Sequence, residues 1–167
     1  DRSPSRGLGD VYKRKVLKSV MEVTKTNITK KMNVDINLKL PKNKIETLGI
    51  GDRIAQVFYN LIDNALSFSK EGSVIDIIAT TTENEAIIEI KDQGPGIPKE
   101  NLGKIFERFY TYRPEEKSFG NNSGLGLSIC KQIIKSLNGT IIANNRLEGG
   151  SVFTVTLPLN KDRKRKK

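Results

Sequence analysis

The chain has 167 residues, 36% of them hydrophobic and 29% charged, a balance that predicts one globular domain with a real core and excludes the disordered class. It contains no histidine and one cysteine, Cys130, which excludes Ser-His-Asp hydrolases, histidine general bases, an internal disulfide and cysteine-based zinc sites. The net charge of +10 is concentrated in residues 13–31 and 161–167, and no aromatic residue interleaves with the terminal run, so charge alone gives little support for nucleic-acid binding.

The first third of the chain predicts a linker, a helix and two strands. Residues 1–9 are rich in turn formers and have no periodicity, which is typical of a linker. Asp10 is the expected N-cap of an amphipathic helix of about five turns, because apolar residues return at spacings of three to five as far as Ile28. Residues 34–40 alternate as a half-buried strand, and residues 45–50 predict a shorter one.

A second helix is expected to open at Gly51-Asp52 and to carry an apolar face as far as Ala65. Asn60 and Asn64 lie four residues apart on it, so they share a face and can both point at one ligand. Asparagine is a mediocre helix former, so two of them one turn apart require a reason. Two ordinary polar surface positions are the alternative interpretation.

The next two strands, residues 74–82 and 86–92, are joined by a short turn and predict a β-hairpin. The second strand ends on the stretch Asp92-Gln-Gly-Pro-Gly-Ile-Pro98. Its two glycines let a backbone approach a ligand closely, and Asp92 can accept a hydrogen bond from a donor bound in the turn. Taken alone, the stretch is equally consistent with an ordinary Asp/Gly/Pro turn.

A glycine motif opens the last predicted helix. A short helical piece ending at residues 105–110 is followed by a polar stretch, residues 111–123, that predicts a mobile loop. Gly124-Leu-Gly126 then begins a helix, and free N–H groups with the helix dipole attract phosphate to such a terminus. Neither the dinucleotide motif Gly-x-Gly-x-x-Gly nor a P-loop Gly-Lys-Ser/Thr is present. The helix is expected to end at Asn138-Gly139, before two final strands at residues 140–144 and 151–159.

Four motifs, in this order, resemble the N, G1, F and G2 boxes of the catalytic ATP-binding domain of sensor histidine kinases. They are Asn60-Leu-Ile-Asp-Asn64-Ala, Asp92-Gln-Gly94-Pro-Gly96, Phe106-Glu-Arg-Phe-Tyr110 and Gly124-Leu-Gly126-Leu127. The similarity covers residues 10–160 and implies an α/β (α+β) two-layer sandwich, a mixed, mostly antiparallel sheet on three helices, with an ATP lid at residues 111–123. Residues 1–9 would link to a missing dimerisation and phosphoacceptor domain, and residues 161–167 would be a basic tail. The lid segments Tyr110-Thr-Tyr-Arg113-Pro and Phe119-Gly-Asn-Asn-Ser-Gly-Leu-Gly126 resemble the lid of envelope-sensing kinases of alphaproteobacteria.

The resemblance also implies a role for each matched residue. Asp92 would accept from the adenine amino group, Gly94 and Gly96 would let the base approach, and Phe68 would stack on it. Asn64 would coordinate Mg²⁺ with the ATP phosphates, with Asn60 in support. The other implied nucleotide contacts are Ile97, Tyr110, Gly124, Leu125, Gly126, Leu127 and Thr154.

One departure from the family pattern concerns the phosphates. Many members carry a lysine before the aromatic residue that follows the N box, and this chain has Ser67 there. Arg113, or a lid lysine such as Lys117, would then supply the missing cation. The implied catalytic residues are therefore Asn60, Asn64 and Arg113.

Three other classes of protein are alternatives to a histidine kinase. Gyrase-type topoisomerases, mismatch-repair ATPases and heat-shock chaperones share the fold and use a glutamate one helical turn before the metal-binding asparagine as general base. Asn60 occupies that position and cannot take a proton, which also argues against anti-sigma-factor serine kinases. An inactive nucleotide-binding interaction module stays open.

The chain has no histidine, so the phosphoryl acceptor is expected outside it. The expected partners are Mg-ATP, the missing phosphoacceptor domain and a cognate response regulator, and nucleic acid is not among them. No apolar stretch has the length of a membrane span and no signal peptide is visible, so the domain is expected in the cytoplasm. The full-length parent would be anchored in the inner membrane through segments not in this sequence.

Overall fold

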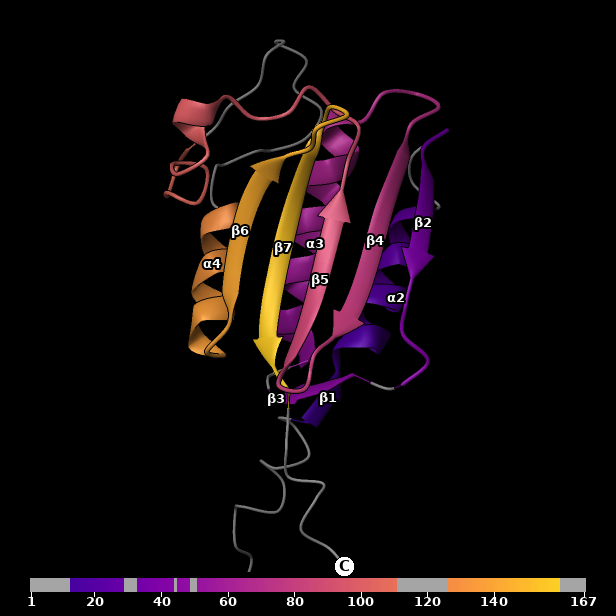
Figure 1. Cartoon of the computed structure of the whole chain (residues 1–167), viewed down its shortest axis with the longest axis vertical. Coiled ribbons are helices and arrows are strands. Elements are labelled where there is room, and N and C mark those ends of the chain that lie inside the picture. Colours follow the sequence, from indigo (N-terminus) through magenta and orange to yellow (C-terminus); the bar gives the residue numbers. More distant parts are fainter. Residues whose placement is uncertain (1–12, 29–32, 44, 49–50, 111–125, 160–167) are drawn as a thin grey trace, which may run out of the picture.

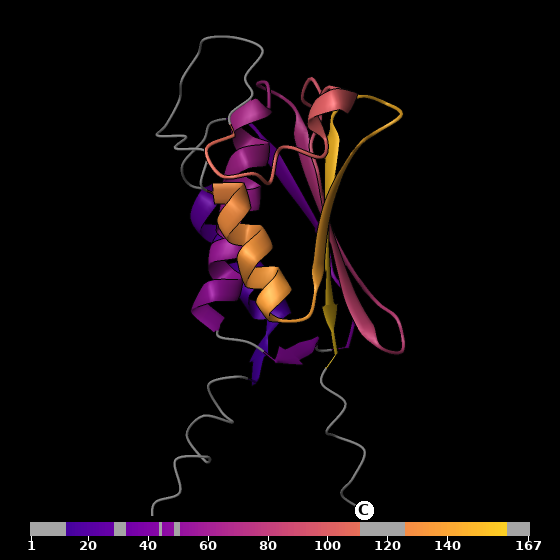
Figure 2. The ribbon, with the colours of Figure 1, turned by 90° about the vertical axis from the view of Figure 1, so that its left-hand side faces the viewer.

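The computed structural model describes residues 13–28, 33–43, 45–48, 51–110 and 126–159. Three helices cover one face of a five-stranded sheet, which gives the two-layer α/β arrangement that the sequence predicts (Figure 1, Figure 2). The helices are α2 (Val16–Ile28), α3 (Gly51–Phe68) and α4 (Gly126–Ser136), with a short 3₁₀ turn, η1 (Lys99–Asn101). The strands are β1 (Lys13–Lys15), β2 (Asp35–Lys39), β3 (Glu46–Leu48), β4 (Val74–Thr81), β5 (Glu85–Lys91), β6 (Thr140–Asn145) and β7 (Ser151–Pro158).

The main sheet is mixed, with strand order β2-β4-β5-β7-β6. The predicted hairpin is confirmed: β4 and β5 pair antiparallel, and the N–H of Thr82 donates to the carbonyl of Glu85 at 2.9 Å across their turn. β2 pairs parallel with β4, and the chain crosses between these strands through β3 and α3, since parallel neighbours need a crossover. β1 and β3 form a separate two-stranded sheet.

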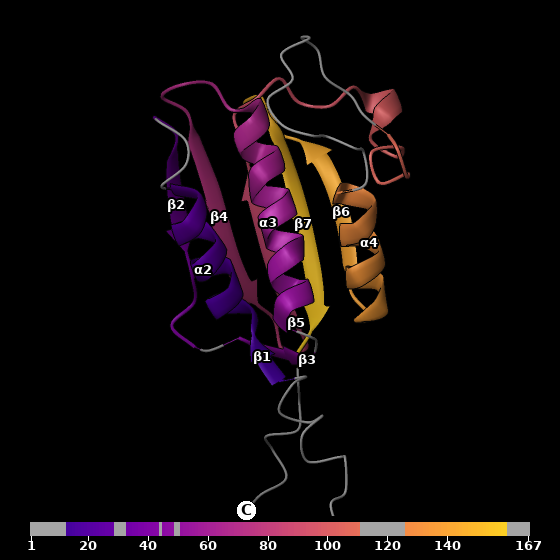
Figure 3. The same cartoon turned by 180° about the vertical axis from the view of Figure 1, so that it is seen from behind.

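The core lies between the helices and the sheet. Alternation along β5 buries Ala86, Ile88 and Ile90, while Ile87 and Glu89 face the side without helices. α3 crosses the middle strands (Figure 3), and its apolar residues recur every three or four positions. Burying one such Ile or Leu side chain is worth roughly 1.5–3 kcal/mol, so this face fixes the helix on the sheet. The buried residues of α3 are Ile54, Val57, Phe58, Leu61, Ile62, Ala65 and Leu66.

Two helix predictions need correction. The first helix begins at Val16, because Lys13–Lys15 form β1 and pair antiparallel with β3. A three-residue run of basic residues has no apolar alternation, so its sequence could not reveal a strand that a distant partner imposes. The helical piece predicted before residue 110 contains only η1, followed by turns. The predicted N-cap Asp10 lies outside the described residues.

The Asp92 motif and the last turn of α3 lie at one end of the sheet. β5 ends there and β7 begins there, while α4 begins beside the middle of α3, where Asn60 contacts Gly126 (Figure 1). The β5–β7 register pairs Lys91 with Val152, so Asp92 comes opposite Ser151, and its N–H donates to the Ser151 carbonyl at 3.0 Å. None of the helices in the described ranges is long and apolar enough to span a bilayer.

Candidate functional site

Asp92 follows β5 directly, and its side chain is 2% exposed. Its Oδ1 accepts hydrogen bonds from the backbone N–H of Gly94 at 2.9 Å and of Ser151 at 3.2 Å. The hydroxyl of Ser151 donates to Oδ2. These three donors hold the carboxylate in one orientation. A carboxylate has about four lone-pair positions, so one remains for a donor on a ligand.

Gly94 lies against the end of α3. A Cβ atom at this position would stand 3.0 Å from Oδ1 of Asp92, 3.0 Å from the carbonyl oxygen of Phe68 and 3.2 Å from the Phe68 Cβ. Any side chain here would push the turn away from the helix. The glycine therefore lets the carboxylate of Asp92 and the aromatic Phe68 share one small region.

Asn60 connects α3 to the beginning of α4. Its Nδ2 donates to the carbonyl of Gly126 at 3.4 Å, and its side chain also hydrogen-bonds with the thiol of Cys130. Burial raises the pKa of the Cys130 thiol to about 11, and the bond to Asn60 acts in the opposite direction. Because the amide nitrogen faces α4, the group that Asn60 can offer to a ligand is its oxygen.

Asn60, Asn64 and Phe68 follow one another at four-residue intervals and form a polar-to-aromatic stripe on α3, which we call the α3 stripe. Gly126 stands at the Asn60 end, where its Cβ would lie 3.9 Å from the Asn60 Cγ, and Gly94 stands at the Phe68 end. Eight residues of helix span about 12 Å. Asn64 is half-buried between the ends, and the structure records no hydrogen bond from its side-chain amide to any described residue.

Thr154 is a correction to the predicted site. Along β7, Phe153 and Val155 are buried against the helices and Thr154 alternates with them, so its side chain lies on the opposite face of the sheet. Its cross-strand neighbours there are Glu89 and Ile142. Asp92, Phe68 and the α3 stripe are on the helix side, so Thr154 does not belong to their group.

Ser151 is a residue that the sequence interpretation missed. It is 4% exposed and holds Asp92 with both its N–H and its hydroxyl. The available signal was a small hydroxyl residue that follows Gly149-Gly150 and starts a strand. Only the pairing of β5 with β7 shows that this position faces Asp92.

The remaining predicted site residues fall into two groups. Gly96, with φ of +78°, and the half-buried Ile97 lie in the turn after Asp92, while the half-buried Tyr110 and Leu127 flank the stretch that is not described. Their contacts with a nucleotide stay predictions. The other predicted residues, Arg113, Lys117, Gly124 and Leu125, lie outside the described residues.

The fold and this arrangement together define a nucleotide-binding domain. A helix N-terminus, which attracts phosphate, stands at one end of the α3 stripe. A glycine turn with a fixed buried carboxylate, which can read the edge of a base, stands at the other end.

Comparison with known proteins identifies the family. Residues 49–161 match the family described as histidine kinase-, DNA gyrase B-, and HSP90-like ATPase. The sensor protein ChvG of Agrobacterium fabrum is 37% identical over 154 residues, covering 86% of this chain and 26% of ChvG. The signal transduction histidine-protein kinase BaeS of Escherichia coli is 36% identical over 130 residues, covering 78% of this chain and 28% of BaeS. The solved catalytic domain of histidine kinase ThkA superposes with a TM-score of 0.75 at 30% identity, covering 87% of this chain and 93% of that domain.

The chain belongs to this family of histidine kinase-, gyrase B- and HSP90-like ATPases, and it is a catalytic ATP-binding domain of the sensor-histidine-kinase type. The family predicted from the four motifs is thereby confirmed, and ChvG, an alphaproteobacterial protein, agrees with the subgroup that the lid segments resemble. The chain spans about a quarter of the length of these two curated relatives, 26% of ChvG and 28% of BaeS.

Proposed function

We propose that this chain binds Mg-ATP and transfers the γ-phosphoryl group to a histidine on a dimerisation domain, as the catalytic part of a sensor kinase in two-component signalling. The observation that carries this proposal is the α3 stripe of Asn60, Asn64 and Phe68. It joins the Asp92 turn to the N-terminus of α4 over about 12 Å, a span suited to an extended nucleoside triphosphate. Membership of an ATPase family supports ATP as the nucleotide.

The Asp92 end of the stripe is the proposed base pocket. The lone-pair position left on the Asp92 carboxylate would accept from the exocyclic amine of adenine, with Phe68 as the stacking residue and Gly94 giving room for the base. Guanine presents a carbonyl oxygen in place of that amine. Two acceptors would then face each other in a buried position, which costs about 1–3 kcal/mol and favours ATP over GTP by about fivefold to 150-fold, with about tenfold expected.

The Asn60 end is the proposed phosphate pocket. The first N–H groups of α4 have no partner within the helix, and together with the helix dipole they attract anions. Gly126 opens this helix, and its carbonyl is tied to Asn60, which fixes the first turn of α4 relative to α3. Gly124 and Leu125 precede it in the sequence and complete the proposed cradle.

Asn64 is the proposed anchor for magnesium. In nucleotide sites Mg²⁺ takes one or two protein oxygens together with phosphate oxygens and water, and it offsets phosphate charge during transfer. The described part of the chain contains no group of three or more Asp, Glu, Cys or His side chains that could hold a metal ion by itself. The residues present therefore fit an ion that arrives with the nucleotide and meets the amide oxygen of Asn64.

Transfer rather than hydrolysis is favoured by Asn60. An ATPase of this fold needs a general base for water, and an amide whose nitrogen is tied to α4 cannot take a proton. The chain has no histidine of its own, so the acceptor lies on another domain. Arg113 is the proposed cation for the γ-phosphate. Holding the acceptor in line with that phosphate supplies most of the rate in such reactions.

The cellular setting is proposed from the relatives' names. They are described as sensor proteins and signal transduction kinases. We infer a parent protein anchored in the inner membrane, with this domain in the cytoplasm and a cognate response regulator as the final phosphoryl acceptor.

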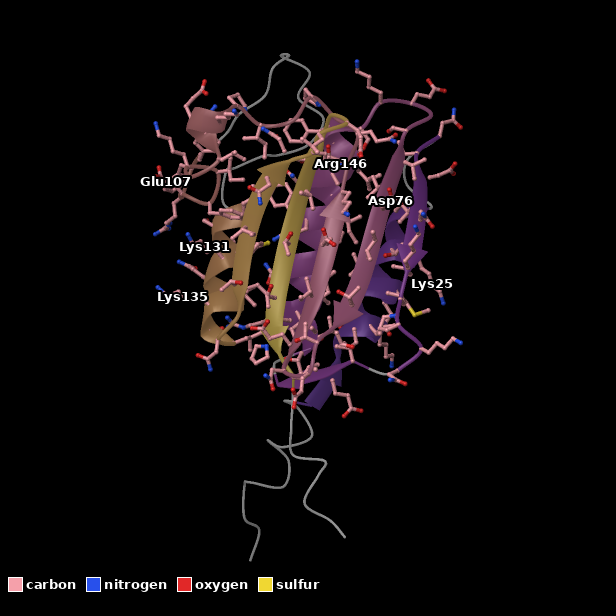
Figure 4. The ribbon with its side chains drawn as sticks, in the orientation of Figure 1. Lys25, Asp76, Glu107, Lys131, Lys135 and Arg146 are labelled. Atoms are coloured by element: carbon pink, nitrogen blue, oxygen red, sulfur yellow. The ribbon has the colours of Figure 1, made fainter. Side chains whose placement is uncertain are left out.

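The proposal is tested with γ-labelled ATP and Mg²⁺, using the chain alone and then with the phosphoacceptor domain of its parent added. Slow, acid-labile labelling of the added domain and no label on the chain are expected. At an ATP concentration near the dissociation constant of the parent, Asp92→Asn should strongly reduce the labelling, whereas Lys135→Ala, on the outer side of α4 (Figure 4), should leave it unchanged. Rapid phosphate release by the chain alone, or acid-stable label on its own serines, would contradict the proposal.

A further inference from the structure

The connection between β6 and β7 contacts the Asp92 turn at both of its ends. Asn145, the last residue of β6, and Arg146, the first residue of the connection, make these contacts. Figure 4 shows Arg146 at the end of the sheet where β7 begins, beside the candidate site. Neither residue belongs to the four motifs, and neither was predicted as part of the site.

Arg146 holds the first residue of the turn. Its Nη1 donates to the backbone carbonyl of Asp92 at 2.8 Å. Its other side lies toward solvent, where Nη2 pairs with Glu148 at 3.1 Å, and the two side chains are 16% and 80% exposed respectively. Arg146 thus makes one buried interaction, with the Asp92 carbonyl, and one solvent-exposed interaction, with Glu148.

Asn145 holds the other end of the turn. Its Oδ1 accepts from the N–H of Ile97 at 2.7 Å, and its Nδ2 donates to the carbonyl of the same residue at 2.6 Å. One side chain therefore satisfies both backbone groups of Ile97, as a neighbouring strand would. This fixes the orientation of the two peptide groups that flank Ile97, because rotation of either would break the hydrogen bond that it makes with Asn145.

Gly150 brings the two backbones into direct contact. A Cβ atom there would stand 2.0 Å from the carbonyl oxygen of Asp92, and the residue has φ of +89°, where L side chains are strained. The same carbonyl receives the Arg146 guanidinium, and the N–H of Arg146 donates to the Gly150 carbonyl at 2.9 Å. The β6–β7 connection is thus a turn closed by its own hydrogen bond, and it packs directly against the Asp92 backbone.

We propose that Asn145 and Arg146 are positioning residues for base recognition. They act through Asp92 and Ile97 and hold the turn in the one conformation in which the Asp92 carboxylate meets the adenine amine. This inference rests on the proposed function, since it assumes that the Asp92 end of the α3 stripe binds the base. The expected consequence is that these residues set the preference for adenine while the phosphate end of the site is independent of them.

The test measures the dissociation constants of non-hydrolysable ATP and GTP analogues by calorimetry, with thermal melting of each variant. Arg146→Met keeps the length of the side chain but removes its donors, and Asn145→Asp keeps the acceptor for Ile97 but replaces the donor with a second oxygen. Each should weaken ATP binding by about tenfold, the value of one lost hydrogen bond, and GTP binding by less than about twofold. Arg146→Lys, which keeps one charged donor, should recover part of the preference for ATP. Glu148→Gln, which changes only the exposed partner of Arg146, is the matched control and should bind like the parent.

The outcomes separate this inference from the proposed function. Suppose that the parent chain prefers ATP and that the variants keep the same ratio of ATP to GTP affinity, or lose affinity for both nucleotides equally. This result would overturn the positioning role and leave the proposed function standing. A parent chain that binds neither nucleotide, or both alike, would overturn the two together. Lower melting temperatures with an unchanged ratio would reduce Asn145 and Arg146 to a structural role.

Discussion

Replacing Asp92 by asparagine isolates the chemistry of base recognition from the stability of the fold. The Oδ1 of an asparagine can still accept from the N–H groups of Gly94 and Ser151, now at 2.9 and 3.2 Å. Its Nδ2 would donate to the Ser151 hydroxyl, which can turn from donor to acceptor. All three protein hydrogen bonds therefore have a replacement.

The expected magnitudes follow from this count. Each retained bond loses its charge assistance, but the buried charge is also removed, so the free energy of unfolding should stay within about 1–2 kcal/mol of the parent. Toward adenine, the variant presents an N–H to another N–H. Losing one charge-assisted hydrogen bond is worth about 1.5–3 kcal/mol, which corresponds to roughly tenfold to a hundredfold weaker ATP binding.

The assay is a calorimetric titration of parent and Asp92→Asn with ATP and GTP analogues, alongside thermal melting. The expected result is a large loss for ATP, a smaller loss or a gain for GTP, whose carbonyl can accept from the new amide, and a similar melting temperature. If the variant binds ATP as the parent does, Asp92 does not recognise the base, and its buried hydrogen bonds serve only to close the turn.

Three further changes test other parts of the structure. Asn64→Ala should remove the Mg²⁺-dependent part of ATP affinity without unfolding the domain, because Asn64 is half-buried and is not part of the core. Titration of ATP with and without Mg²⁺ measures this effect. If the variant binds Mg-ATP as the parent does, Asn64 is an ordinary surface residue. Burial raises the pKa of the Cys130 thiol from 9.0 to about 11, so above pH 9 the unfolded chain loses the thiol proton at a lower pH than the folded chain does. The free energy of unfolding should therefore fall by up to about 2–3 kcal/mol as the pH rises from 9 to 11. Denaturant titrations at several pH values measure that slope, and Cys130→Ala should lack it; an equal slope in both proteins would show that the thiol is not its source. Gly139→Ala would place a Cβ 2.4 Å from a backbone carbonyl of β7 and should lower stability by about 1–3 kcal/mol, whereas Gly103→Ala meets nothing within 4 Å and should melt like the parent.

The parts of the site that the sequence could predict are those carried by local spacing. Asn60 and Asn64 lie on one face of α3 because helical geometry places residues four apart together. The Asp92 turn was recognisable because an alternating strand ended on a carboxylate and two glycines. In each case the elements that carry the residues formed where the local pattern indicated.

The parts that the sequence could not predict depend on contacts between distant segments. Ser151 and Arg146 meet Asp92 across 59 and 54 residues, through the pairing of β5 with β7 and the shape of the β6–β7 connection. The assignment of Thr154 to the site was wrong for a local reason, not because of a distant contact. In a strand, moving by one residue reverses the face of the sheet, so a position assigned from a motif alone can be on the wrong side.

The location of the nucleotide is tested most directly by following backbone amide resonances of the ¹⁵N-labelled chain during titration with Mg²⁺ and a non-hydrolysable ATP analogue. The proposed site predicts that the amides of Gly94, Ile97 and Gly126, at the two ends of the α3 stripe, shift together with one dissociation constant. Glu89 and Thr154, on the far face of the sheet, should not move. Shifts confined to the far face, or no shift at either end of the stripe, would contradict the account.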